Sequence, residues 1–179
     1  RARGPLLLGH GRHVRMSSLD RLLAASLPLV PKPIVRRVAR PYIAGETLAD
    51  LIAVVRSLNT DGFMAAAGIL GEFVDSTKEA EGAVREYEEL LAAIQTQALD
   101  SNVPLKLTHL GLKLDPDLCY RNVRRLVAAA RDRDNFIRID MEDSSCTDDT
   151  LAIYERLRGE FENVGTVIQA RLRRSLVDV

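Results

Sequence analysis

One stretch in the second half of the chain decides the fold, and it reads Phe136-Ile137-Arg138-Ile139-Asp140-Met141-Glu142-Asp143-Ser144-Ser145. Its first residues alternate between apolar and polar side chains, as a strand does, and this pattern stops at a group of acidic residues. The serines that follow are typical of a helix start. The stretch therefore predicts a β-strand with polar groups at its C-terminal end and a helix directly after it.

The same pattern occurs once upstream and once downstream of this stretch. Upstream, residues 103–111 read Val-Pro-Leu-Lys-Leu-Thr-His-Leu-Gly and carry Lys106. Downstream, residues 164–170 read Val-Gly-Thr-Val-Ile-Gln-Ala and carry Gln169. In barrels of alternating strands and helices, polar residues at the C-terminal strand ends usually perform the chemistry. Together the three stretches predict one wall of such an active site.

A fourth apolar run, Phe63–Leu70, is bounded by turn residues and predicts a buried strand. The other expected strands begin at Val103, Phe136 and Val164, so starts recur at intervals of about 30 to 40 residues. Strand–helix alternation at this spacing predicts parallel strands with helical crossovers. A full eight-fold barrel needs about 250 residues, so we expect an α/β fold, the N-terminal part of a (β/α)8 TIM-like barrel with about four βα units. A small doubly wound sheet is the alternative, although no Gly-x-Gly-x-x-Gly motif follows a strand.

Several helices have clear signals. Apolar residues spaced three and four apart form a stripe over Leu48–Leu58, and a longer helix is expected from Thr77 to about Gln97. Asp115-Pro116 is an acidic cap followed by a first-turn proline, which predicts another helix start. The run Ser145–Asp148 resembles a loose capping box and predicts the start of the helix after the third strand.

Domain organisation follows from the change in pattern along the chain. Residues 1–15 are rich in Arg and Gly without an apolar period, and we expect a disordered leader ahead of Met16. Residues 16–60 are expected to form a helical arm, and residues 61–179 the half barrel. Within the arm, Ile34–Arg40 reads either as a short helix with a solvated basic face or as a surface that contacts anionic lipid.

Composition narrows the range of partners. Lys plus Arg and Asp plus Glu both number 25 among 179 residues, and this balance argues against a dedicated nucleic-acid surface. No apolar run reaches about 18 residues, so no membrane span is expected. Cys119 and Cys146 have no metal or redox spacing and are expected to be packing residues. Free cysteines favour a reducing cytoplasm, with peripheral contact at the inner membrane if the basic surface binds lipid.

Alternation along the strands points Lys106, Arg138 and Asp140 into the barrel. A lysine on an otherwise apolar strand is costly without a counter-charge, so Asp140 on the next strand is its expected partner. With Gln169, a cation, a carboxylate and an amide would meet at one mouth. A buried structural ion pair is the alternative interpretation of the Lys106–Asp140 pair.

Three other titratable groups lie near this mouth. His109 follows the second strand and is expected to be hydrogen-bonded or exposed. Glu142 and Asp143 are expected to be loop charges or anions at a helix start.

The three stretches quoted above resemble the second, third and fourth barrel strands of the monofunctional bacterial proline dehydrogenases. Leu70-Gly71-Glu72 resembles the end of their first strand, and the resemblance covers Gly45 to Val179. It implies a distorted (β/α)8 barrel that holds FAD. It also implies oxidation of L-proline to 1-pyrroline-5-carboxylate, with transfer of the electrons to a quinone.

The matching motifs imply a role for each site residue. Lys106 would bind the proline carboxylate as a point charge. Asp140 would be the catalytic carboxylate that positions Lys106 and the substrate end of the flavin, while Met141 and Gln169 would contact the flavin ring. The flavin would supply the hydride chemistry, and the protein orientation and electrostatics.

The resemblance has two departures and one gap. Gly68 stands where the family has Asp, and Arg171 where it has Tyr. The family's next strand, with a flavin-contacting arginine, and two arginines that bind the substrate carboxylate would lie beyond Val179. We therefore expect this chain alone to be an inactive fragment that self-associates through open barrel edges. A Schiff-base aldolase built on Lys106 and a non-catalytic half barrel that pairs with another chain are the alternatives.

Overall fold

A computed structural model of the protein describes residues 31, 34 and 43–179. The chain divides into two compact units, Arg1–Ile43 and Ala44–Val179. The expected leader over residues 1–15, the first part of the helical arm and, apart from Ile34, the basic segment up to Arg40 lie outside the described residues. The predicted boundaries of leader, arm and barrel stay predictions.

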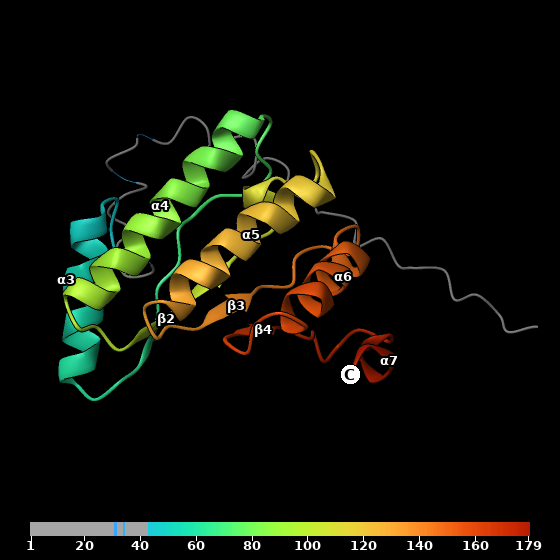
Figure 1. Ribbon diagram of the computed structural model, residues 1–179. Helices are drawn as coiled ribbons and strands as arrows, with labels where there is room; N and C mark the ends of the chain where they lie inside the picture. The colour runs from blue at the N-terminus through green and yellow to red at the C-terminus, as the bar shows by residue number, and fades with distance from the viewer. Residues whose placement is uncertain (1–30, 32–33, 35–42) are drawn as a thin grey trace, which may run out of the picture. The chain divides into compact units, whose positions relative to one another are not determined.

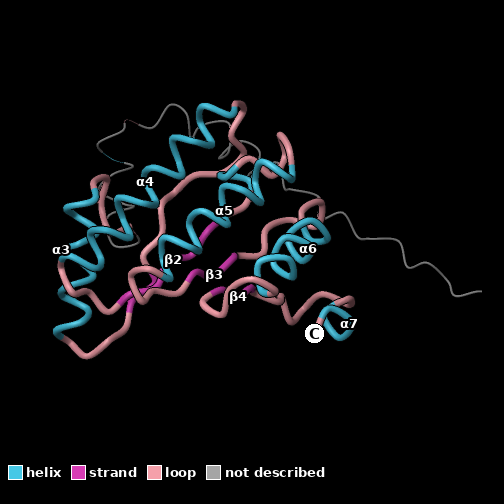
Figure 2. Tube along the Cα trace, viewed as in Figure 1, coloured by secondary structure: helices cyan, strands magenta, loops and turns pink. Residues whose placement is uncertain are grey.

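The second unit alternates strands and helices along the chain (Figures 1 and 2). Its elements are α3 (Leu48–Thr60), β1 (Ala65–Ala66), α4 (Thr77–Thr96), β2 (Ser101–Leu105), the 3-10 helix η2 (Thr108–Leu110), α5 (Pro116–Arg131), β3 (Ile137–Ile139), α6 (Thr147–Arg158), β4 (Val164–Thr166) and α7 (Ser175–Asp178).

The four strands form one parallel sheet in the order β1-β2-β3-β4. Each strand is followed by a helix, so four βα units are present, as the spacing of the apolar runs predicts. A doubly wound sheet would reverse its strand order at a switch point. The sequential order therefore rules out the doubly wound alternative and agrees with a barrel segment.

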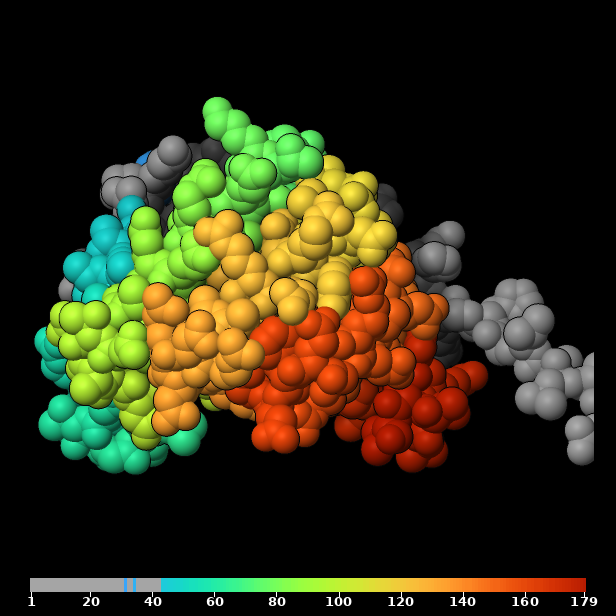
Figure 3. All heavy atoms as spheres, in the orientation of Figure 1, coloured from blue at the N-terminus to red at the C-terminus, as the bar shows by residue number. Residues whose placement is uncertain are grey.

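Helices α4, α5 and α6 lie side by side over one face of the sheet, and their side chains form a continuous surface in Figure 3. Beneath them Val103, Leu105, Ile137 and Ile139 are completely buried. The alternation predicted for β2 and β3 is confirmed, because the apolar residues face the helices and the polar residues between them stay partly exposed.

The register of the sheet brings the ends of β2 and β3 to one level. Leu105 lies opposite Ile139, and the backbone N–H of Asp140 donates to the carbonyl of Leu105 at 2.9 Å. Lys106 and Asp140 consequently leave the sheet side by side.

Most helix predictions are confirmed. In α3, Val55 is buried on the predicted stripe. Helix α4 ends one residue before the expected limit, and α5 begins at Pro116, with the Asp115 side chain accepting from the N–H of Asp117 at 2.9 Å.

The capping box predicted at Ser145–Asp148 is wrong. Helix α6 begins at Thr147, and its N-cap Cys146 makes no side-chain capping bond. The Ser145 hydroxyl instead accepts from the Lys113 ammonium at 2.7 Å, and its backbone N–H donates to Asp143 at 2.7 Å. The Ser145 side chain, which the local pattern assigned to the cap, therefore binds Lys113 in the connection between η2 and α5 instead.

The predicted buried strand Phe63–Leu70 is wrong in its length. Only Ala65–Ala66 pair with β2, while Phe63 is 62% exposed and Leu70 is 81% exposed. Within the described residues β1 lies at the edge of the sheet, so its apolar run has a strand partner on one side only. The fourth strand is also shorter than predicted, because it ends at Thr166.

The two cysteines are packing residues, as predicted. Cys119 and Cys146 are both free and buried. Over residues 43–179, none of the helices has the length and apolar character needed to cross a membrane.

Candidate active site

A pocket of about 330 Å³ lies where the strands end and the helix-bound loops begin. Side chains from all four strand-to-helix connections line it: Glu72, Phe73, Lys106, Met141, Glu142, Asp143 and Gln169. Three residues predicted from the sequence, Lys106, Met141 and Gln169, thus meet at one site. The fourth, Asp140, is not part of the lining.

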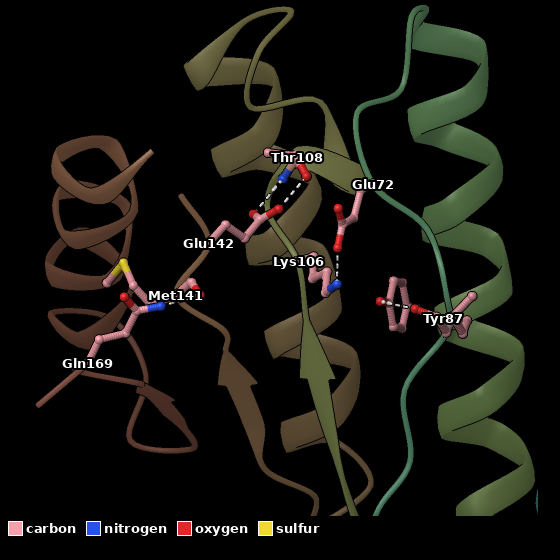
Figure 4. Close-up of polar contacts among 8 residues, drawn as sticks. Glu72, Tyr87, Lys106, Thr108, Met141, Glu142 and Gln169 are labelled. Atoms are coloured by element: carbon pink, nitrogen blue, oxygen red, sulfur yellow. Dashed lines mark hydrogen bonds and ion pairs between the residues drawn. The ribbon is translucent and has the colours of Figure 1, made fainter. Parts of the chain in front are cut away.

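Lys106 forms an ion pair with Glu72, and their charged ends point toward one another in Figure 4. The hydrogen bond to Glu72 raises the pKa of Lys106 above its usual range, so the amine stays protonated. The expected Lys106–Asp140 pair is therefore wrong, because the connection between β1 and α4 brings a nearer carboxylate to the ammonium group.

Asp140, which directly follows β3, has its partner on that strand. Arg138 Nε lies 3.2 Å from Asp140 Oδ1, and both side chains are about one-third exposed. Residues two apart on a strand share a face, which is why this pair forms. Asp140 still acts on the site over a longer range, since its charge contributes to the raised pKa of Lys106.

Glu142 binds the start of η2. Its carboxylate accepts from the backbone N–H of Thr108 at 3.0 Å and also from the Thr108 hydroxyl, as Figure 4 shows. Asp143 accepts from Ser145, and this hydrogen bond lowers the pKa of Asp143. Glu142 thus caps a 3-10 helix and Asp143 is a loop charge, in agreement with the expectation for both.

Met141 and Gln169 lie together on the side of the pocket opposite Glu72 (Figure 4). The Gln169 side-chain amide donates to the backbone carbonyl of Met141 at 3.5 Å. The backbone carbonyl of Gln169 accepts from the Ser175 hydroxyl at 2.6 Å. A thioether and an amide in adjacent positions suit the edge of a flat heteroaromatic ring. Met141 and Gln169, the two residues predicted to contact a flavin ring, thus lie in adjacent positions on one wall of the pocket.

His109 supports the loop that carries Glu72. A Cβ added to Gly71 would lie 2.3 Å from two ring atoms of His109, so only glycine fits there. The imidazole packs edge-on against Tyr87, with ring centroids 6.1 Å apart, and Nδ1 is buried without a hydrogen-bond partner. Burial lowers the pKa of His109. The expectation of a hydrogen-bonded or exposed histidine is wrong for Nδ1.

Two pocket residues were missed by sequence reasoning, Glu72 and Phe73. Phe73 has a backbone φ of +48°, a strained conformation for a residue with a side chain. The available signal was position: both residues follow the apolar run of the first strand, where a βα barrel places its site.

The two departures from the family pattern lie in different surroundings. A Cβ at Gly68 would be 2.9 Å from Pro104 Cγ, so a larger residue there requires Pro104 to move. Arg171 is exposed, two residues after Gln169.

Fold and site together define a class: α/β-barrel proteins whose pocket lies at the C-terminal strand ends and is lined there by a lysine, carboxylates and an amide. A family model for proline dehydrogenase matches residues 51–179. Proline dehydrogenase 1 of Bacillus subtilis subsp. natto is 40% identical over 141 residues, which is 79% of this chain and 47% of that protein. Proline dehydrogenase of Deinococcus radiodurans is 35% identical over 167 residues, covering 86% and 54% respectively.

Solved structures agree with the fold. Proline utilization A from Bdellovibrio bacteriovorus, inactivated by N-propargylglycine, superposes with a TM-score of 0.73 at 24% identity, over 88% of this chain and 19% of that one. The chain belongs to the proline dehydrogenase family. It spans about half the length of the curated relatives it matches.

Proposed function

We propose that this chain supplies one wall of a site that oxidises L-proline to 1-pyrroline-5-carboxylate with FAD. The observation that carries the proposal is the pocket itself. Lys106, Met141 and Gln169, which the family resemblance assigns to substrate and flavin, line one cavity although they come from three different strand ends.

In this proposal Lys106 binds the carboxylate of proline through its protonated amine. Met141 and Gln169 orient the flavin ring, which when bound supplies the two-electron oxidising group. Asp140, held by Arg138, adds negative charge beside Lys106 without touching it. Apolar packing of β2 and β3 beneath α5 holds these groups rigidly, which is what a site that works by orientation requires.

The proposal extends to a quinone as the electron acceptor. It also includes a peripheral contact with the inner membrane from the cytoplasmic side, for which residues 34–40 are the candidate segment.

The aldolase alternative is disfavoured by the state of Lys106. A Schiff-base lysine is activated by a lowered pKa, so that a neutral amine can attack a carbonyl. The bond to Glu72 raises the pKa of Lys106 instead. The ammonium group is thus suited to binding an anion and unsuited to nucleophilic attack.

The test is a chimera that joins this chain to the unmatched remainder of Proline dehydrogenase 1 from Bacillus subtilis subsp. natto. We expect a yellow protein with a flavin absorption band that reduces a quinone analogue when proline is added. Lys106→Met should abolish most of this activity, whereas Lys78→Met, an exposed lysine on α4, should not. A folded chimera that holds FAD and leaves proline unoxidised would show the proposal to be wrong.

A further inference from the structure

The backbone hydrogen bonding between β2 and β3 ends just before the pocket. Its last bond runs from the N–H of Asp140 to the Leu105 carbonyl at 2.9 Å, and within the described residues no backbone bond joins the two segments beyond it. Lys106 and Met141, which line the pocket, are the next residues of these two segments. Their relative position therefore depends on side-chain contacts beyond the sheet.

Glu142 and Thr108 supply such a contact, although they lie 34 positions apart in the chain. One carboxylate oxygen of Glu142 accepts from the backbone N–H of Thr108 at 3.0 Å, and the other accepts from the Thr108 hydroxyl. Thr108 is only 1% exposed. Because both oxygens bind donors of a single buried residue, the carboxylate fixes the direction of the contact as well as its length.

This pair lies at the centre of a series of bonds that crosses all four strand-to-helix connections. On one side, the Val74 N–H donates to the Thr108 carbonyl at 3.4 Å, and on the other, the Gln169 side-chain amide donates to the Met141 carbonyl at 3.5 Å. Figure 4 shows Glu142 reaching toward Thr108 from the side of the pocket where Met141 and Gln169 lie. The outer bonds are long, so the bonds between Glu142 and Thr108 are the strongest of the series.

A second link joins the same two connections farther from the sheet. The Lys113 ammonium donates to the Ser145 carbonyl at 2.9 Å and to the Ser145 hydroxyl at 2.7 Å. Lys113 is exposed, and its long side chain carries a freely rotating point charge. Such a link tolerates displacement of either connection, so Lys113 offers a matched comparison for the buried pair.

We propose that Glu142 is a positioning residue: by binding Thr108 it holds the pocket wall that carries Lys106 in fixed alignment with the wall that carries Met141 and Gln169. A site that works by orientation needs its groups held to within about 0.5 Å by supporting hydrogen bonds of this kind. The inference rests on the proposed function where that function assigns a ligand to each wall. Glu142 then acts on the rate of reaction through alignment of the two ligands.

The first test measures the alignment in the full chain, without flavin or turnover. The chain is labelled with 13C at its methionine methyl groups, and the signal of Met141 reports on the far wall. Thr108→Val removes the hydroxyl and should shift the Met141 signal by more than its linewidth. The signal of Met64, beside β1, should stay in place and show that the fold is intact. Thr108→Ser keeps the hydroxyl and should restore the wild-type signal, and Lys113→Met should leave it unchanged.

The second test measures the rate in the chimera described above. Thr108→Val and Glu142→Ala should each lower kcat by about tenfold or more, while the KM for proline and the content of bound FAD change by less than about threefold. The reason is that each wall still binds its own ligand, whereas the alignment between the ligands is lost. Retained FAD shows that the variants fold. Lys113→Met should leave both kcat and KM as in the wild-type chimera.

Three outcomes would overturn the inference: a Met141 signal that Thr108→Val does not move, a Lys113→Met variant as impaired as Thr108→Val, or variants that raise KM and leave kcat unchanged. An inactive wild-type chimera, with the Met141 signal still responding to Thr108→Val in the chain, would reject the proposed function alone. An active chimera whose Thr108→Val and Glu142→Ala variants keep their kcat would reject this inference alone.

Discussion

Each charged side chain at the mouth of the sheet has its own partner. Lys106 is bound to Glu72, and Asp140 to Arg138. The two pairs share no hydrogen bond, but they are coupled through the charge of Asp140, which contributes to the raised pKa of Lys106. The consequences differ for binding and for stability.

Lys106→Met should weaken binding of proline to the chain while leaving its fold intact. The lost interaction is a hydrogen bond between charged groups, worth about 1.5–3 kcal/mol. The measurement is a titration of the chain with proline, followed by the 13C-methyl signal of Met141, which lines the pocket; Lys78→Met is the control for loss of a surface charge. Equal affinity in the wild-type and Lys106→Met chains would leave Lys106 a structural role only.

Asp140→Ala should cost little stability. Its pair with Arg138 is about one-third exposed, and ion pairs of this kind contribute about 0–1 kcal/mol because water screens them. Urea denaturation of both chains measures the difference. A loss of more than about 3 kcal/mol would indicate that Asp140 neutralises a buried charge, as the sequence alone had indicated for Lys106.

His109 should make the domain lose stability below neutral pH. Burial lowers its folded-state pKa below the ordinary value of 6.5, and the positive charge of Lys106 acts in the same direction. The negative charges of Glu86 and Glu142 oppose this shift. The unfolded chain therefore takes up the proton first, so this contribution is present above pH 6.5 and is lost as pH falls toward the folded pKa.

The melting temperature of the wild-type chain should thus fall more steeply between about pH 7 and pH 5.5 than that of His109→Gln. His10 and His13 are common to both chains, so they cancel in the comparison. If melting temperature fell with pH equally in the wild-type and His109→Gln chains, protonation of His109 would not be the cause of the loss of stability.

Among the secondary-structure elements, α5 depends visibly on its cap. The Asp115 carboxylate satisfies the N–H of Asp117, and Pro116 occupies the first turn. Asp115→Ala should therefore destabilise the domain by about 1 kcal/mol in urea denaturation. Glu89→Ala, on the exposed side of α4, is the control and should change stability by a few tenths of a kcal/mol at most. Equal effects of the two substitutions would mean that the cap contributes nothing.

At the scale of the whole molecule, the sheet has two edges without a strand partner among the described residues, one at β1 and one at β4. Beside β1, Phe63 and Met64 are 62% and 67% exposed. Unpaired edges with apolar flanks favour pairing between chains. We expect the isolated chain to associate as its concentration rises, in sedimentation-velocity experiments.

Met64→Lys should reduce this association, because a lysine beside the edge opposes strand addition. Leu176→Lys, at a residue 94% exposed on α7 and away from the strands, should leave it unchanged. A wild-type chain that stays monomeric at all concentrations would show that the edges are protected.

Local patterns in the sequence were sufficient for most of the architecture. Alternation around Lys106 and Arg138 identified β2 and β3, and the Asp115-Pro116 pair located the start of α5. These features depend on neighbours in the chain: a strand places alternate residues on opposite faces, and a cap satisfies backbone groups within one turn. For the same reason, residues at three strand ends could be predicted to share one pocket.

Only the tertiary structure decided which groups meet within that pocket. Glu72 and Lys106 are 34 positions apart, and no periodicity links them; the β1–α4 connection brings the carboxylate to the ammonium group. The length of β1 was likewise decided by its place at the sheet edge, since an apolar run signals burial but cannot show how many residues find a partner strand. Charge pairing and strand length depend on which distant segments of the chain come together in space. Local sequence patterns do not show this, because it is decided only when the whole chain is folded.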